Sequence, residues 1–365
     1  MPKPDASELQ ALGLYDADAP HAAATLELLT VLLGLGATVE ELLVYRDQLP
    51  GLASVVTIRG GPALTVTQAV ERSGLSEDKV RRLTRAAGFP EPGPDDRFFG
   101  PGFVELASGI AAAEHMFGDD AVLQLVRVMG SAMSRVADAI VSAFLINVEA
   151  AARAEDPVGL AVARANADAA ALLPFVASTL ETMLRQHLLA ARRTILGDAI
   201  DTGYESQHLA VGFVDLVGST ALAQRLSTRE LGAVLTEFEN EAADAVTACG
   251  GRVVKLIGDE ILYTAPDERA GCAIALQLAA AFAEHPRVPQ TRAGLAGGDV
   301  LLRDGDVFGP VVNLAARAVK LAAPCELVAT AAAVAAAGLD GEPVDVEQVK
   351  GFDVAVRLRR VRGGG

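Results

Sequence analysis

The chain has 365 residues, of which 51% are hydrophobic and 21% charged, so it is a folded globular protein with room for two domains. Its formal net charge is −16 at pH 7, which argues against nucleic acid or an anionic membrane as a partner, because both require a basic face. The first ten residues, MPKPDASELQ, are polar and acidic and do not form a secretory signal, so we expect a cytoplasmic protein.

Residues 1 to about 200 carry apolar residues at three- and four-residue spacings, which is typical of amphipathic helices. The clearest runs are Leu26–Leu33, Ala121–Val148 and Leu160–Leu196. We therefore predict an all-α domain over 1–200, whose last helix, at about 183–200, connects it to the rest of the chain. Since a whole helical domain is joined through one helix, we expect it to be regulatory.

The segment Thr65–Gly88 predicts a helix-turn-helix, with Gly74 between the helices and Ser76 as the N-cap of the second. The second helix is basic and carries Lys79, Arg81, Arg82 and Arg85. One interpretation is contact with DNA. The other is a packing module with a solvated basic face, and it is favoured because the surrounding domain is acidic.

After about residue 205, short strand-like runs alternate with helices. We place the domain boundary in the polar segment Asp201–Gln207 and a second domain over 206–365. The predicted strands are Leu209–Val214, Arg252–Ile257, Ile261–Thr264, Arg292–Ala296 and Val354–Val361. A capping box at Ser227–Glu230 opens the first intervening helix, and the next spans Arg269–Ala283. The order β-α-β-β-α-β predicts an α+β, ferredoxin-like palm.

The stretch GFVDLVGST places Asp215 at the end of a predicted buried strand. A carboxylate there is costly unless a positive group neutralises it. Gly218 lets the chain turn, and Ser219 or Thr220 can cap the next helix, whose N–H groups attract an anion. We therefore expect Asp215 to hold a divalent cation against a phosphate.

The stretch KLIGDEIL predicts a hairpin with Asp259 in its turn. From there Asp259 can meet Asp215 on a neighbouring strand, and paired aspartates on adjacent strands are how two-metal phosphoryl-transfer sites are built. Glu260 adds a third carboxylate nearby, which could tune metal affinity, although a solvated turn residue is the favoured interpretation.

The stretch DVFGPVVNLAAR predicts a helix opened by Pro310. Asn313 and Arg317 are four residues apart on one face of it. An amide beside a guanidinium suits a sugar and a phosphate, and a polar pair on a mostly apolar helix points to a role of this kind.

Together the motifs FVDLVGST, KLIGDEIL and DVFGPVVNLAAR closely resemble the class III nucleotidyl cyclase catalytic domain, over about residues 206–361. A helical domain followed by one such domain resembles the soluble actinobacterial adenylate cyclases with an autoinhibitory regulatory domain. The resemblance implies conversion of ATP to 3′,5′-cyclic AMP and pyrophosphate.

The resemblance also assigns roles to residues of this chain. Asp215 and Asp259 match the two metal-binding aspartates, which implies two divalent cations, Mg²⁺ or Mn²⁺, in each site. Asn313 matches the ribose-orienting asparagine, and Arg317 matches the arginine that stabilises the transition state.

Lys255 and Asp306 match the family's adenine-selecting pair. An ammonium serves the ring-nitrogen acceptor of adenine and a carboxylate accepts from its amino group, whereas guanine reverses both roles. In the family, guanylate specificity goes with glutamate and a small polar residue or cysteine at these positions. ATP is therefore the expected substrate.

In the family, the two aspartates come from one protomer and the other four site residues from its partner. The resemblance thus implies a homodimer with two equivalent sites. His187 lies in the connector helix and His208 follows it, and a histidine titrates near neutral pH. Since similar regulated cyclases include pH-responsive ones, these two residues are candidate sensors.

Other readings of the chain remain open. One alternative to an adenylate cyclase is a DNA- or ligand-binding regulator with a silent cyclase fold, and another is a guanylate or dual-specificity cyclase. A GGDEF-type dinucleotide cyclase shares the palm topology, but GDEIL is not its signature and the Asn313–Arg317 helix does not fit it.

Overall fold

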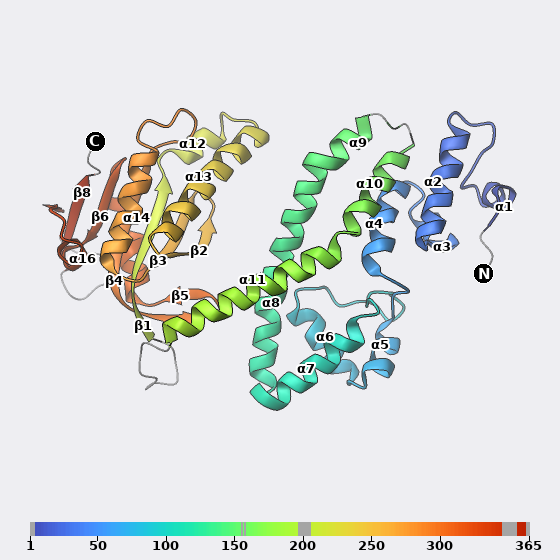
Figure 1. Cartoon of the computed structure of the whole chain (residues 1–365), viewed down its shortest axis with the longest axis horizontal. Coiled ribbons are helices and arrows are strands. Elements are labelled where there is room, and N and C mark those ends of the chain that lie inside the picture. The colour runs from blue at the N-terminus through green and yellow to red at the C-terminus, as the bar shows by residue number, and fades with distance from the viewer. Residues whose placement is uncertain (1–3, 155, 157, 196–205, 345–355, 363–365) are drawn as a thin grey trace. The chain divides into compact units, whose positions relative to one another are not determined.

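The computed structural model describes residues 4–154, 156, 158–195, 206–344 and 356–362. The chain divides into two compact units, Met1–Gly197 and Asp198–Gly365 (Figure 1). Two predictions fall partly or wholly outside the described residues: the end of the connector helix with the boundary segment 201–205, and the start of the strand Val354–Val361. Each unit is described by itself.

The first unit is helical. Its elements are α1 (Ala6–Ala11), α2 (Ala22–Leu35), α3 (Val39–Val44), α4 (Leu49–Arg59), α5 (Val66–Ser73), α6 (Glu77–Ala86), α7 (Phe103–Phe117), α8 (Asp119–Phe144), the π-helical turn η1 (Leu145–Glu149), α9 (Ala150–Ala154), α10 (Leu160–Ala170) and α11 (Leu173–Ile195). The apolar run Leu160–Leu196 forms two helices, α10 and α11, which are separated by Ala171 and Leu172. Pro174 lies in the first turn of α11, where its missing N–H breaks no helical bond, whereas in the interior of one continuous helix its ring would clash with the carbonyl four residues earlier.

The predicted helix-turn-helix forms as α5 and α6. Gly74 ends α5 with φ of 71°, and the Ser76 side chain accepts a hydrogen bond from the Lys79 amide. The four basic side chains of α6 form ion pairs with acidic residues of the same unit: Lys79 with Glu114 and Asp119, Arg81 with Glu77, Arg82 with Asp119, and Arg85 with Glu91. A helix whose charges are already matched has little left for phosphates, so the packing interpretation is favoured.

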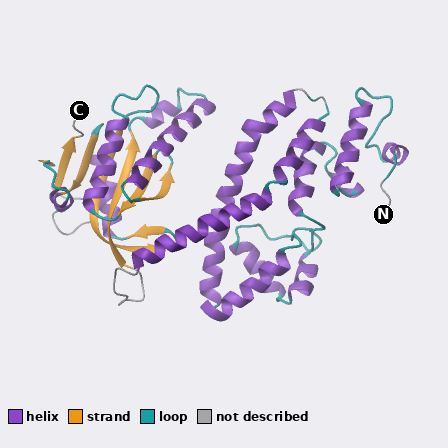
Figure 2. Ribbon diagram, in the orientation of Figure 1, coloured by secondary structure: helices purple, strands orange, loops and turns teal. Residues whose placement is uncertain are grey.

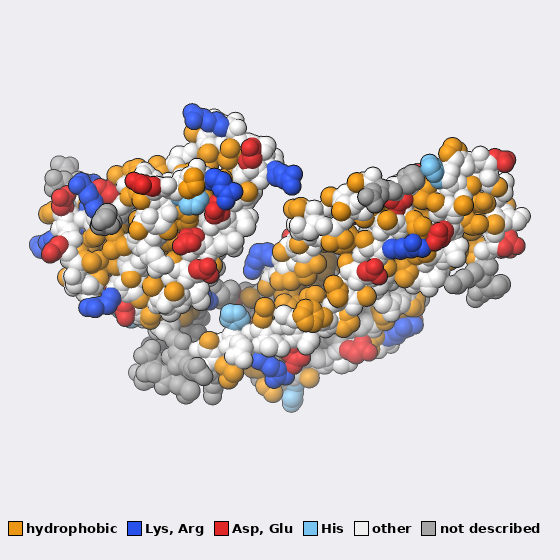
Figure 3. Space-filling model, turned by 45° about the horizontal axis from the view of Figure 1, so that its top comes forward, with side chains coloured by type: hydrophobic (Ala, Val, Ile, Leu, Met, Phe, Trp, Pro, Cys, Tyr) orange, Lys and Arg blue, Asp and Glu red, His pale blue; other side chains and the backbone are white. Residues whose placement is uncertain are grey.

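Apolar side chains are exposed over this unit (Figure 3). Those of α8 and α11 include Leu125, Met129, Met133, Ile140, Met183, Leu184, Leu188 and Leu189. Two stretches, 119–154 and 160–191, are long and apolar enough by length and composition to cross a membrane. This is weak evidence, since core helices of other proteins pass the same test, and the absence of a membrane partner stays a prediction.

The second unit contains the strands, shown in orange in Figure 2. Its elements are β1 (Ser206–Leu216), α12 (Ser219–Ala223), α13 (Thr228–Ala248), β2 (Arg252–Ile257), β3 (Glu260–Ala265), α14 (Glu268–Ala281), β4 (Thr291–Arg303), β5 (Asp306–Phe308), α15 (Pro310–Leu321), β6 (Glu326–Thr330), α16 (Ala331–Ala336), β7 (Glu342–Pro343) and β8 (Leu358–Arg362).

One mixed sheet runs in the order β2-β3-β1-β4-β6-β8-β7, with β5 added beside β4. The pairs β1–β3, β1–β4 and β2–β3 are antiparallel, and β4–β6 is parallel. The first four strands in the order β2-β3-β1-β4, connected by α13 and α14, confirm the predicted ferredoxin-like palm. Figure 1 shows α13 and α14 side by side against the sheet, and their residues are in contact.

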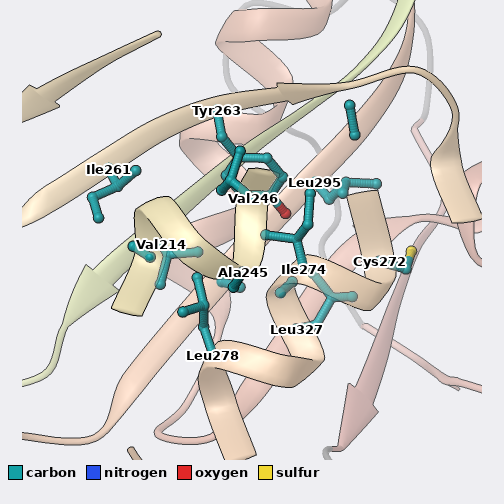
Figure 4. Packing of buried hydrophobic residues seen from close by; sticks show 14 of the residues in the cluster. Val214, Ala245, Val246, Ile261, Tyr263, Cys272, Ile274, Leu278, Leu295 and Leu327 are labelled. Carbon is teal, nitrogen blue, oxygen red and sulfur yellow. The ribbon is translucent and has the colours of Figure 1, made fainter. Parts of the chain in front are cut away.

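Two apolar clusters form the core. Side chains of α13, α14 and α16 pack with one face of the sheet, and those of α15 pack with the other. Tyr263 is fully buried in the first cluster, and Figure 4 shows it beside Val246 and Leu295. Its hydroxyl donates to the Gly271 carbonyl at 2.8 Å, so burial of this polar group is compensated.

Candidate active site

Asp215 lies near the end of β1, between Glu260 on β3 and Arg292 on β4. Arg292 donates from Nε and Nη2 to the Asp215 Oδ2 atom, at 2.8 and 2.5 Å. The positive group that a carboxylate in an apolar strand requires is here a guanidinium. From the sequence, Arg292 is only the start of a predicted strand, although an arginine that opens an otherwise apolar run is a sign of a buried charged partner.

Asp259 occupies the β2–β3 turn, which Gly258 allows with φ of 68°. The Leu216 amide donates to the Asp259 carbonyl at 3.2 Å, and the Ser219 hydroxyl donates to its carboxylate. The structure thus brings Asp215 and Asp259 to neighbouring ends of β1 and the hairpin. We call these two residues the aspartate corner.

The predicted cap of the helix after β1 is wrong. Gly218, with φ of 75°, is the N-cap of α12 and makes no side-chain cap hydrogen bond. Ser219 is the first helical residue, and its hydroxyl is directed to Asp259 instead. The serine therefore holds the turn aspartate rather than the helix end.

Glu260 is the first residue of β3, paired with Asp215, and it is partly buried. The expectation of a solvated turn residue is wrong. Burial raises the pKa of Glu260 above its ordinary value, and the negative charge of Asp215 raises it further. This third carboxyl group therefore shares the electrostatic environment of the aspartate corner.

The donor chemistry of the aspartate corner fits a hard divalent cation, because both residues offer carboxylate oxygens. Among the described residues, no three His, Cys, Asp or Glu side chains are gathered in a metal-binding arrangement.

Lys255 and Asp306 form the second predicted pair. Lys255, on β2, donates from Nζ to the Asp306 carboxylate. Asp306 begins β5, and its other oxygen accepts from the Val307 amide at 2.8 Å. In the part of the chain that the structure describes, no hydrogen bond or ion pair joins this pair to the aspartate corner. Lys255 and Asp306 thus hold each other across β2 and β5.

Asn313 and Arg317 are one turn apart on α15, as the spacing predicts. The helix approaches the sheet closely because Gly294 on β4 has no side chain. A Cβ atom there would lie 2.1 Å from the Val319 nitrogen and 2.5 Å from the Ala315 carbonyl oxygen. Gly294 thus sets the position of α15 and of the two polar residues that it carries.

The candidate pH sensors have different surroundings. His187 is exposed on α11. His208, on β1, lies 3.0 Å from a Glu268 carboxylate oxygen and 3.4 Å from an oxygen of Asp299. The hydrogen bond to Glu268 raises the pKa of His208 above its ordinary value, and the pairing with Asp299 adds to it.

The His208 pairing predicts a pH-dependent contribution to folding. Because the folded-state pKa is raised, the protonated histidine stabilises the fold below its unfolded pKa, and this is lost as pH rises through the folded pKa. Since the side chain is 58% exposed, we expect less than about 1 kcal/mol. Urea unfolding of the wild type and His208→Gln from pH 5.5 to 8.5 measures it, with His187→Gln as control. The difference in free energy of unfolding between the wild type and His208→Gln should become smaller as the pH rises. A difference that is the same at every pH would contradict a stabilising role for protonated His208.

No family model matches the sequence. The chain is 37% identical to the uncharacterised protein Rv2212 of Mycobacterium tuberculosis, covering 83% of this chain and 81% of the relative. It is 34% identical to an adenylate cyclase of Streptomyces coelicolor (71% and 67% covered) and 28% identical to the pH-sensitive adenylate cyclase MT1302 of M. tuberculosis (83% and 79% covered). Among solved structures, the adenylyl cyclase CyaB from P. aeruginosa matches 43% of this chain and 95% of its own, at 22% identity and a TM-score of 0.37.

The identity to the Streptomyces enzyme extends over 260 residues, which exceeds the length of the second unit. The relationship therefore includes part of the helical unit as well as the palm. With the palm topology and the three motifs in order, the chain belongs to the actinobacterial class III adenylate cyclases.

Proposed function

We propose that this chain converts ATP to 3′,5′-cyclic AMP and pyrophosphate, at sites formed between two copies of itself. The observation that carries the proposal is the ion pair between Lys255 and Asp306. It places an ammonium donor beside a carboxylate acceptor, which matches the ring nitrogen and the amino group of adenine. The partner expected for this pair is therefore the base of ATP.

The remaining residues act on the sugar and the phosphates. Asn313 hydrogen-bonds the ribose and orients its 3′-oxygen toward the α-phosphorus. The 3′-hydroxyl gives its proton to solvent, and a bond forms between its oxygen and the α-phosphorus as the bond from the α-phosphorus to the leaving pyrophosphate oxygen breaks. Arg317 donates to the α-phosphoryl oxygens, where negative charge develops.

Asp215 and Asp259 would hold two divalent cations, Mg²⁺ or Mn²⁺. When bound, these ions lower the pKa of the attacking hydroxyl and neutralise the leaving pyrophosphate. The family pattern gives the two aspartates to one protomer and Lys255, Asp306, Asn313 and Arg317 to the partner.

The choice of ATP over GTP is tested by exchanging the base-reading pair. Lys255→Glu with Asp306→Cys should lower kcat/KM for ATP by about 100-fold, because the site then leaves polar groups of adenine unpaired. The ratio of GTP to ATP use should rise. Initial rates with each nucleotide measure both, with Arg252→Glu as a charge-reversal control at the exposed start of β2. A wild type that prefers GTP would favour the guanylate cyclase alternative.

We further propose that the helical unit regulates the second unit and that the protein acts in the cytoplasm, where ATP is present. The relative named as pH-sensitive supports a pH-responsive form of this regulation. The test compares the full chain with residues 198–365, which form a compact unit. Their rates of cyclic AMP formation, measured from pH 5.5 to 8.5, should differ from each other in size and in pH dependence. Equal rates and equal profiles would contradict the proposal.

A silent, DNA-binding regulator would instead retain duplex DNA on a filter and make no cyclic AMP.

A further inference from the structure

Three charged residues stand side by side across three strands of the second unit. Glu260 on β3 is in register with Asp215 on β1, which is in register with Arg292 on β4. Neighbouring strands are about 4.8 Å apart, so side chains in register on them interact directly. The middle carboxylate therefore has a like charge on one side and an opposite charge on the other.

The contact between Arg292 and Asp215 is of the strong kind. Two donors of one guanidinium reach the same carboxylate oxygen, at 2.8 and 2.5 Å. The side chain of Asp215 is only 15% exposed and that of Arg292 is 33% exposed. Charge-assisted hydrogen bonds that are sheltered from water keep more of their strength than exposed ones.

This contact engages one of the two carboxylate oxygens of Asp215, Oδ2. A divalent ion coordinated by Asp215 would therefore either share the carboxylate with Arg292, at the same or the other oxygen, or displace the guanidinium. Sharing places two positive groups next to each other in a partly buried site, where their repulsion is poorly screened. Displacement breaks two charge-assisted hydrogen bonds. Both routes weaken binding of a free metal ion.

We propose that Arg292 is a positioning residue that competes with the divalent cation for Asp215. In the metal-free chain it neutralises and orients the carboxylate, and a metal ion binds only by overcoming this contact. The inference rests on the proposed function, because it takes Asp215 as a metal ligand.

The test is Mn²⁺ binding to the full chain without nucleotide, followed by the electron paramagnetic resonance signal of free Mn²⁺. Arg292→Gln should bind Mn²⁺ about tenfold more tightly than the wild type. Its melting temperature without metal should be lower than that of the wild type, and the rise on adding Mn²⁺ should be larger. A purely structural ion pair would lower the melting temperature and leave Mn²⁺ affinity unchanged.

Three further variants make the result specific. Arg287→Gln removes an arginine of the same unit that pairs with Glu237 at 2.9 Å, so it tests whether net charge alone changes the affinity. Arg292→Lys keeps a positive charge and should bind Mn²⁺ more like the wild type than Arg292→Gln does. Adding Asp215→Ala to Arg292→Gln should abolish the tenfold gain.

Unchanged or weaker Mn²⁺ binding by Arg292→Gln would overturn the inference, as would an equal gain in Arg287→Gln. If Arg292→Gln does not fold, Arg292→Lys decides, since its weaker, single-point contact should still give a measurable gain. Cyclic AMP formation with Mn²⁺ distinguishes failure of the inference about Arg292 from failure of the proposed metal site. Activity with no change in affinity removes the inference alone, whereas no activity and no Mn²⁺ binding in any variant removes the proposed metal site as well.

Discussion

Gly294→Ala should destabilise the protein by about 3 kcal/mol or more, because the added Cβ meets the backbone of α15 rather than a flexible side chain. The atoms in its way are the Val319 nitrogen at 2.1 Å and the Ala315 oxygen at 2.5 Å. The whole helix must shift, and Asn313 and Arg317 shift with it. We therefore expect cyclic AMP formation to fall by about 100-fold even where the variant is folded.

Urea unfolding and rates at low temperature measure the two effects. The matched control is Gly232→Ala on α13, where a Cβ meets nothing within 4 Å. That change should leave activity unaltered and raise stability slightly, by about 0.5 to 1 kcal/mol, because alanine is the better helix former. If Gly294→Ala is as stable and active as Gly232→Ala, the role given to Gly294 in placing α15 is wrong.

Arg317→Ala should lower kcat by about 100- to 1000-fold with little change in KM, because the guanidinium acts on charge that develops only in the transition state. Steady-state rates with ATP and Mn²⁺ measure this. Arg317→Lys should recover part of the loss, since it restores the charge without the fork of donors. A large rise in KM with kcat unchanged would place Arg317 in ground-state binding instead.

Mixing two inactive variants shows whether each substitution inactivates only the site that contains it. It also shows whether each site is shared between two protomers. In an equal mixture of Arg317→Ala and Asp215→Ala, half of the dimers are mixed, and each of these has one intact site of two. Activity should therefore return to about one quarter of the wild type. A mixture that stays inactive would contradict the shared-site homodimer.

The palm could be predicted because local sequence features, such as apolar runs and the glycines between them, mark its strands and turns. The strand Arg252–Ile257 was predicted with the bounds that the structure has, since Gly250–Gly251 and Gly258 mark its ends. β4 is much longer than its prediction, Arg292–Ala296. Gly297 and Gly298 suggest a break, but both continue the strand in register with β1, and the Glu268 side chain lies against Gly297.

Contacts within the site were only partly predictable. The residue types within a motif and the order of the motifs along the chain indicate a chemistry, as the aspartates Asp215 and Asp259 do for a metal. The guanidinium on Asp215 depends on the register of β1 against β4, which are far apart in sequence. The Ser219 contact depends on where the hairpin turn reaches α12. Contacts of this kind, between residues far apart in the chain, cannot be predicted from the local pattern of a single sequence.

If the chain makes cyclic AMP from ATP with metal held by the aspartate corner, product formation must depend on both the metal and Asp215. The direct measurement is product formation by the purified full chain, with ATP and with GTP, in Mn²⁺ or Mg²⁺, beside Asp215→Ala. We predict metal-dependent cyclic AMP from ATP for the wild type and none from Asp215→Ala. Equal product from both proteins, or none from the wild type with either nucleotide and either metal, would contradict the assignment of this site.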